Sequence, residues 1–157
     1  NQSLLVNEGG MITTDPKGKA IRQATFYPFQ DAAKYAKGTA LRASAKLPEK
    51  ETEHHGMQET VTVACTYGET TGQIAVFAMN CDAQEDVTLS LSLRSFGTLR
   101  SLGWRELYNE DMYARNTFEE EFRVVPADRE LPEIQDSQIT VTLKKHSWNV
   151  LRFEEAR

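Results

Sequence analysis

The spacing of apolar residues changes from a helical period to a strand period close to Gly38. Before that residue, four apolar side chains recur at i, i+3, i+4 and i+7, which places them on one stripe of a helix: Phe29, Ala32, Ala33 and Ala36. Thr25 suits the N-cap, Pro28 suits the first turn, and Gly38 suits the position just after the last turn. The pattern predicts one helix over residues 25–38.

After Gly38, apolar and polar residues alternate in several short segments. Residues 61–66, 87–94 and 139–144 alternate closely enough to predict strands with one buried face. Residues 74–79 and 147–153 carry apolar side chains on both faces, which predicts central strands or strands covered on their outer face. Short strands joined by turns predict an antiparallel β-sandwich, so the fold class is mainly β with one α-helix in front.

Two polar stretches interrupt these strands. Residues 48–59 hold several glutamates and the pair His54–His55, and residues 109–137 form a longer acidic connection. Both are predicted as loops, and loops of this length are often functional or lie against another domain. The first 38 residues hold a short apolar segment at residues 4–6 and one helix, which cannot make a βαβ unit. We therefore expect residues 1–38 to be the end of a different domain.

Composition excludes several classes of protein. The chain has 157 residues and a formal net charge of −5, which argues against nucleic acid as a partner. It has no apolar run long enough for a membrane span, and its start lacks the order of a secretory signal. Cys65 and Cys81 match no zinc motif, and we expect them to be buried, unpaired and apolar in role.

Few residues are candidates for chemistry. His54 and His55 point to opposite sides of an extended segment, so a solvated loop is favoured over a metal site. The run at residues 119–121 is favoured as solvated glutamates, and His146 as a structural residue. Gln23 differs, because it precedes the helix at a position that faces the active site if residues 4–6 are a barrel strand. Its amide can donate and accept hydrogen bonds, which suits a sugar hydroxyl.

The stretch from Arg22 to Gly38, Arg-Gln-Ala-Thr-Phe-Tyr-Pro-Phe followed by a helix, resembles the final barrel helix of family 51 α-L-arabinofuranosidases. Three later segments are also similar to the C-terminal domain of that family: Leu93 to Phe96, Asn116-Thr117-Phe118, and Ser147 to Arg152. The match covers essentially the whole chain, in the family's order. One departure is Ile21, which stands where the family has a tryptophan.

The resemblance implies a (β/α)₈ barrel followed by a β-sandwich of jelly-roll type. Residues 1–38 would then be the last strand and helix of the barrel, and residues 39–157 the sandwich. The family removes terminal, non-reducing α-L-arabinofuranosyl groups with retention, using an acid/base glutamate and a nucleophilic glutamate. Both glutamates lie upstream of the segment matched here, so no residue of this chain is predicted to be catalytic, and the chain alone is predicted to be inactive. Gln23 matches the family's substrate-binding glutamine.

The resemblance has further implications. No cofactor and no metal is expected. The expected partners are arabinofuranosyl-containing oligosaccharides and the chain's own catalytic barrel, with the full-length enzyme a homo-oligomer in the bacterial cytoplasm. The family's sandwich also uses strand material from the extreme N-terminus of the full chain, so one edge of this sandwich is expected to be open or differently paired.

Two other classes stay open from the sequence. The chain could be a carbohydrate-binding module in which aromatic side chains stack on sugar rings, the candidates being Trp104, Tyr108, Tyr113 and Trp148. It could also be a protein-binding sandwich with an unpaired edge strand. Burial of the aromatic residues separates the first of these from a supporting domain.

Overall fold

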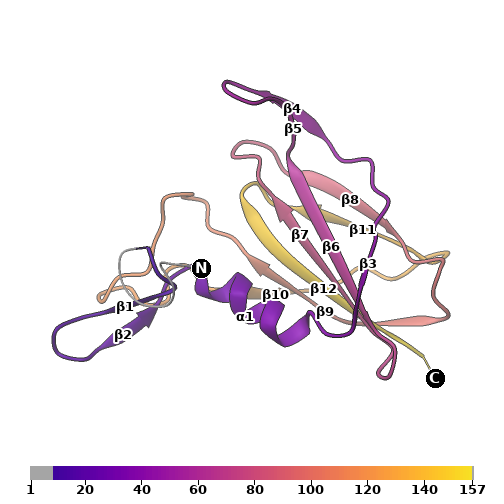
Figure 1. Cartoon of the computed structure of the whole chain (residues 1–157), viewed down its shortest axis with the longest axis horizontal. Coiled ribbons are helices and arrows are strands. Elements are labelled where there is room, and N and C mark those ends of the chain that lie inside the picture. Colours follow the sequence, from indigo (N-terminus) through magenta and orange to yellow (C-terminus); the bar gives the residue numbers. More distant parts are fainter. Residues whose placement is uncertain (1–8, 157) are drawn as a thin grey trace.

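The computed structural model describes residues 9–156, so the apolar segment at residues 4–6 lies outside the described residues (Figure 1). One helix and twelve strands follow one another along this part of the chain. They are β1 (Ile12–Thr14), β2 (Ala20–Arg22), α1 (Phe26–Tyr35), β3 (Thr39–Leu41), β4 (Glu49–Thr52), β5 (Gly56–Glu59), β6 (Val61–Gly68), β7 (Gln73–Asn80), β8 (Val87–Ser92), β9 (Leu99–Leu107), β10 (Ala127–Arg129), β11 (Gln138–Leu143) and β12 (Ser147–Glu155).

The larger layer is a six-stranded sheet in the order β10-β9-β12-β7-β6-β3, in which every neighbouring pair is antiparallel. β7 and β12 are its two central strands and pair with each other from Ser147–Asn80 to Glu154–Gln73. Both of their faces are largely buried. The prediction that segments 74–79 and 147–153 are central strands is therefore confirmed.

The second layer of the sandwich is the antiparallel pair β11-β8. β11 alternates strictly between exposed and buried residues, as its sequence predicts. The main core lies between the two layers and joins Val76 and Phe153 of the large sheet to Leu89 and Val141 of the small one. Apolar burial on this scale is the main force that holds two sheets face to face.

The outer face of the large sheet is covered by α1. Tyr27 and Asp31 are the buried residues of the helix, and Tyr35, at the same spacing again, packs on Phe77 and Val150 of the sheet. The predicted stripe lies on other faces of the helix, since Phe29 is 55% exposed and Ala33 and Ala36 are also exposed. The side of the helix that the apolar spacing indicated therefore points away from the sandwich.

The helix ends at Tyr35, three residues before Gly38. Gly38 adopts φ +88°, and a Cβ at this position would lie 2.2 Å from the carbonyl oxygen of Tyr67. Only glycine tolerates both the left-handed backbone and this close approach. Gly38 thus lets the chain turn directly from the helix into the edge strand β3.

Two predicted loops and the predicted burial of one cysteine need correction. Within residues 109–137, predicted as a loop, Ala127–Arg129 form the edge strand β10 of the large sheet. Residues 48–59, predicted as a loop, form the antiparallel hairpin β4–β5, whose residues are all exposed. Because neither strand has a buried face, the sequence has no alternation of apolar and polar residues that would predict this hairpin. Cys81, predicted to be buried, is exposed because it lies just after the end of β7; Cys65 is half-buried and both thiols are free.

A second hairpin, β1–β2, projects from the sandwich ahead of α1, with Ile21 buried in it (Figure 1). The long loop (residues 108–126), drawn in orange, extends from β9 and lies beside this hairpin. Lys19 of the hairpin donates to the carbonyl of Phe118 and pairs with Glu121, so the two segments are in contact. Within the described residues, no helix has the length and apolar character that a bilayer crossing requires.

Candidate functional site

Gln23 lies in the short connection between β2 and α1, where the backbone is well ordered by local hydrogen bonds. Its N–H donates to the carbonyl of Met11 at 2.8 Å, which continues the β1–β2 ladder by one bond. Its carbonyl accepts from the N–H of Phe26 at 3.0 Å, which begins the first turn of α1. The backbone of Gln23 is therefore fixed by hydrogen bonds through both its N–H and its carbonyl, and this fixes the starting point of the side chain.

The side-chain amide of Gln23 is anchored by two acceptors. Nε2 donates to Oγ1 of Thr13 at 3.0 Å and to the backbone carbonyl of Asn116 at 3.1 Å. Thr13 belongs to β1 and Asn116 to the long loop, so the amide joins the hairpin to the loop. Among the described residues, none donates to the Oε1 atom of Gln23.

Asn116 is 2% exposed, and its side chain has three hydrogen bonds. Nδ2 donates to the carbonyls of Arg22 and Val124, at 2.7 and 3.0 Å, and Oδ1 accepts from the N–H of Val124 at 2.7 Å. In the sequence, Asn116 is notable only as part of a family-like tripeptide. Because 93 positions separate it from Gln23, no local pattern in the sequence signals their contact.

A cavity of about 520 Å³ opens beside Gln23. The connection and hairpin form one side of it, and the long loop forms the other through Arg115, Phe118 and Glu119. It thus combines an amide, a guanidinium, a carboxylate and an aromatic ring. These are groups that can bind the hydroxyls and the apolar face of a sugar.

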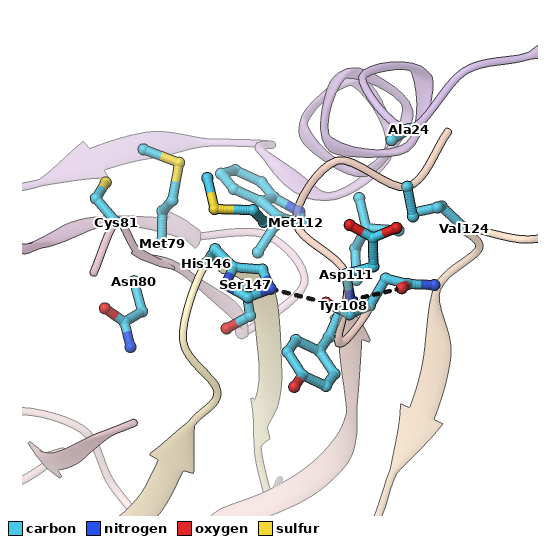
Figure 2. A pocket seen from close by; sticks show the side chains of 14 residues that line it. Ala24, Met79, Asn80, Cys81, Tyr108, Asp111, Met112, Val124, His146 and Ser147 are labelled. Atoms are coloured by element: carbon cyan, nitrogen blue, oxygen red, sulfur yellow. Dashed lines mark hydrogen bonds between the residues drawn. The ribbon is translucent and has the colours of Figure 1, made fainter. Parts of the chain in front are cut away.

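A second cavity, of about 300 Å³, is also lined by residues of the long loop and is shown in Figure 2. Its wall is largely apolar and includes Met79, Met112 and Trp148. His146 also lines it, but Nε2 of its ring is within 2.7 Å of the carbonyl of Asn109. The imidazole is thereby held by the loop, in agreement with a structural role. Nearby, hydrogen bonding to Glu110 raises the pKa of Tyr108 to about 12.

The other candidate residues do not converge on a site. His54 and His55 are exposed at the tip of the β4–β5 hairpin, and no group of three potential ligands that could hold a metal ion occurs among residues 9–156. Glu121 pairs with Lys19 and Glu120 with Arg123. Two of the three glutamates at residues 119–121 are therefore engaged in ion pairs, whereas Glu119 lines the cavity beside Gln23.

The two most deeply buried carboxylates each have an arginine partner. Asp31 of α1 lies 3.0 Å from Nε of Arg105 on β9, and Glu106 lies 3.5 Å from Arg129 on β10. Burial raises the pKa of both carboxyl groups, and the attraction of the arginine opposes this rise. The pairs face opposite sides of the sheet, so they do not form the closely spaced carboxylate pair of a retaining hydrolase.

Among residues 9–156, the candidate aromatic side chains are not exposed together as one sugar-stacking surface. Trp104 is buried in the core and donates to Oδ1 of Asn149 at 2.9 Å. Trp148 is half-buried and stacks at an angle on Phe77, whereas Tyr113 is 83% exposed on the long loop. Burial of the tryptophans favours a supporting domain over a carbohydrate-binding module.

Comparison with known proteins gives a family match over nearly all of the chain. The family model described as the α-L-arabinofuranosidase C-terminal domain matches residues 1–147. An intracellular exo-α-(1→5)-L-arabinofuranosidase from Acetivibrio thermocellus is 31% identical over 94% of this chain and 29% of its own length. An exo-α-(1→6)-L-arabinofuranosidase from Bifidobacterium longum is 33% identical over 94% of this chain and 28% of its own length.

Solved structures agree with these relatives. A family 51 α-L-arabinofuranosidase from Bifidobacterium longum superposes with a TM-score of 0.88 at 31% identity, over 96% of this chain and 29% of that one. A family 51 arabinofuranosidase from Xanthomonas axonopodis pv. citri gives a TM-score of 0.83 at 22% identity, over 96% and 30% of the two chains, which shows the shared fold. The chain spans less than a third of the length of each of these relatives.

Proposed function

Because this chain belongs to the family of α-L-arabinofuranosidase C-terminal domains, we propose that it is the C-terminal part of a longer glycoside hydrolase. That enzyme would release terminal, non-reducing α-L-arabinofuranosyl groups from oligosaccharides with retention. The family match over residues 1–147 is the observation that carries this proposal. The chain itself would act as a supporting domain, without either catalytic glutamate.

The contribution of this chain to substrate binding would be Gln23. The amide borders a cavity of about 520 Å³ and retains an acceptor atom that no described residue uses. A hydroxyl of the bound arabinofuranosyl group would donate to this atom. The cavity would be completed by the catalytic domain, which would supply the two glutamates.

The first 38 residues would belong to the catalytic barrel, as its last strand and helix, and residues 39–157 would form the sandwich. The exposed stripe of α1, which includes Phe29, supports this division because an apolar helix face is normally covered. The small layer, in which the described residues supply only β11 and β8, leaves room for strand material from elsewhere in the longer protein.

The longer enzyme would be a cytoplasmic homo-oligomer. The relatives named above support the compartment, since one of them is described as intracellular. Exposed apolar side chains on the long loop, such as Phe122 at 75%, are available for contacts between subunits. Light scattering of the longer protein measures its mass, and a monomer would contradict this part of the proposal.

The activity is tested with 4-nitrophenyl α-L-arabinofuranoside. We expect the 157-residue chain to release no 4-nitrophenol, and the longer protein that contains it to release 4-nitrophenol with multiple turnovers. Turnover by the pure 157-residue chain would contradict a supporting role. A longer protein that folds but cleaves no arabinofuranoside would contradict the proposed activity.

A further inference from the structure

The carbonyl of Asn116 determines which way the amide of Gln23 faces. A backbone carbonyl can only accept a hydrogen bond, so the atom 3.1 Å away from it must be the NH₂ group. If the amide were flipped, two oxygens would face each other. The second donor of the same NH₂ group goes to Oγ1 of Thr13. With both donors used, Oε1 is the atom of the amide that is left for a ligand.

The carbonyl of Asn116 is itself held in place by its own side chain. That side chain reaches Arg22, the residue immediately before Gln23, and it also closes the loop by two bonds to Val124. All three distances lie between 2.7 and 3.0 Å, and the group is shielded from water. Buried hydrogen bonds of this kind hold their partners in one geometry because breaking them leaves polar atoms unsatisfied.

We infer that Asn116 is a positioning residue that turns the Gln23 amide so that Oε1 accepts a hydrogen bond from a sugar hydroxyl. The inference rests on the proposed function, in which Gln23 contacts the substrate. It adds a role for the long loop: the sandwich domain would set the geometry of a substrate contact that lies outside the sandwich. It also specifies the contact, since the ligand atom must be a donor.

The test is a double-mutant cycle in the longer enzyme, measured as kcat/KM on an arabinofuranoside. Gln23→Ala and Asn116→Ala should each lower kcat/KM about tenfold, as expected for one lost hydrogen bond that orients the substrate. In the Gln23→Ala background, Asn116→Ala should have little further effect, because the group that it positions is gone. Asn109→Ala is the matched control, since the side chain of Asn109 also holds the long loop together, through Arg123 and Asp111, and neither of these hydrogen bonds reaches Gln23. It should stay within about twofold of the wild type.

The outcomes separate the two proposals. If Gln23→Ala leaves kcat/KM unchanged, the substrate contact itself is wrong. If Gln23→Ala lowers kcat/KM but Asn116→Ala acts equally in both backgrounds, or Asn109→Ala is as harmful, the contact stands and the positioning role is overturned. Should Asn116→Ala fail to fold, Asn116→Asp keeps the volume and the acceptor for the N–H of Val124 but removes the donor to the carbonyls of Arg22 and Val124. The same dependence on Gln23 is then expected, and independence from Gln23 would refute the role.

Discussion

Buried polar residues connect segments of this chain that apolar packing alone would leave loosely placed. Asn149 is fully buried in β12; it accepts from the indole of Trp104 and donates to Oγ of Ser147. Asn116 has the same function between the long loop and β2. Such side chains are unfavourable in a core unless each polar atom finds a partner, so their contacts are specific in geometry.

Asp82, at the turn after β7, predicts a measurable dependence of stability on pH. Its carboxylate accepts from the N–H groups of Gln84 and Glu85 and from Nζ of Lys50, and these bonds hold its pKa below the ordinary value of 3.8. Between the folded-state pKa and the ordinary pKa of 3.8, the folded protein therefore binds fewer protons than the unfolded chain. The stabilisation is complete above the ordinary pKa and is lost as the pH falls through the folded-state pKa.

Asp82→Asn removes this titration. We expect the free energy of unfolding at pH 7, measured by urea denaturation, to fall by about 1–2 kcal/mol because the charge-assisted bonds are lost. The difference from the wild type should shrink as the pH falls below 3.8. A difference that is the same at pH 7 and at pH 3 would show that the charge of Asp82 contributes nothing.

At the scale of elements, the predictable strands are those with one clearly buried face. β8 and β11 pair along their full length without a register shift. Their side chains therefore alternate regularly between the core and solvent, and the sequence shows this alternation. β9 was not predicted, because a register shift interrupts its pairing with β12 and because charged residues occur on both of its faces. Those charges, Arg105 and Glu106, are compensated by partners from distant segments, which no local pattern can reveal.

The helix was predicted, but its buried side was not, and the reason is an ion pair. Asp31 lies on the side of α1 that faces the sheet and is 2% exposed. It can be buried there because it forms an ion pair with Arg105 of β9. A sequence pattern treats an aspartate as a solvent-facing residue. Here the carboxylate, together with Tyr27, marks the side of the helix that contacts the sheet.

Asp31→Ala should therefore loosen α1 from the sheet. It leaves the partly buried guanidinium of Arg105 without its partner, and we expect a loss of about 2 kcal/mol in the free energy of unfolding. Gln30→Ala, on the same helix, serves as the control and should change it by less than about 0.5 kcal/mol. Equal effects of the two substitutions in urea denaturation would rule out the ion pair as the attachment of the helix.

At the scale of the molecule, the sandwich was predictable and the candidate site was predictable only in part. Gln23 is a candidate from the sequence because it directly precedes the helix and because its neighbours resemble a family motif on a short stretch of chain. Asn116 and the cavity wall come from residues about 90 positions later. Their approach depends on how the long loop folds back against the β1–β2 hairpin, which the sequence pattern does not encode.

The exposed stripe of α1 allows a test of the whole arrangement. Phe29 is 55% exposed in this chain, so Phe29→Glu should change its free energy of unfolding by less than about 0.5 kcal/mol. In the proposed longer enzyme the same ring would be buried against the catalytic domain. The substitution should then lower the Tm by several degrees, because a buried aromatic ring contributes about 2 kcal/mol and a buried charge is unfavourable. Lys37→Glu, at an exposed position just after the helix, should leave both the free energy of unfolding of this chain and the Tm of the longer enzyme nearly unchanged. An unchanged Tm for Phe29→Glu in the longer enzyme would mean that the outer face of α1 is a free surface and that the catalytic domain docks elsewhere.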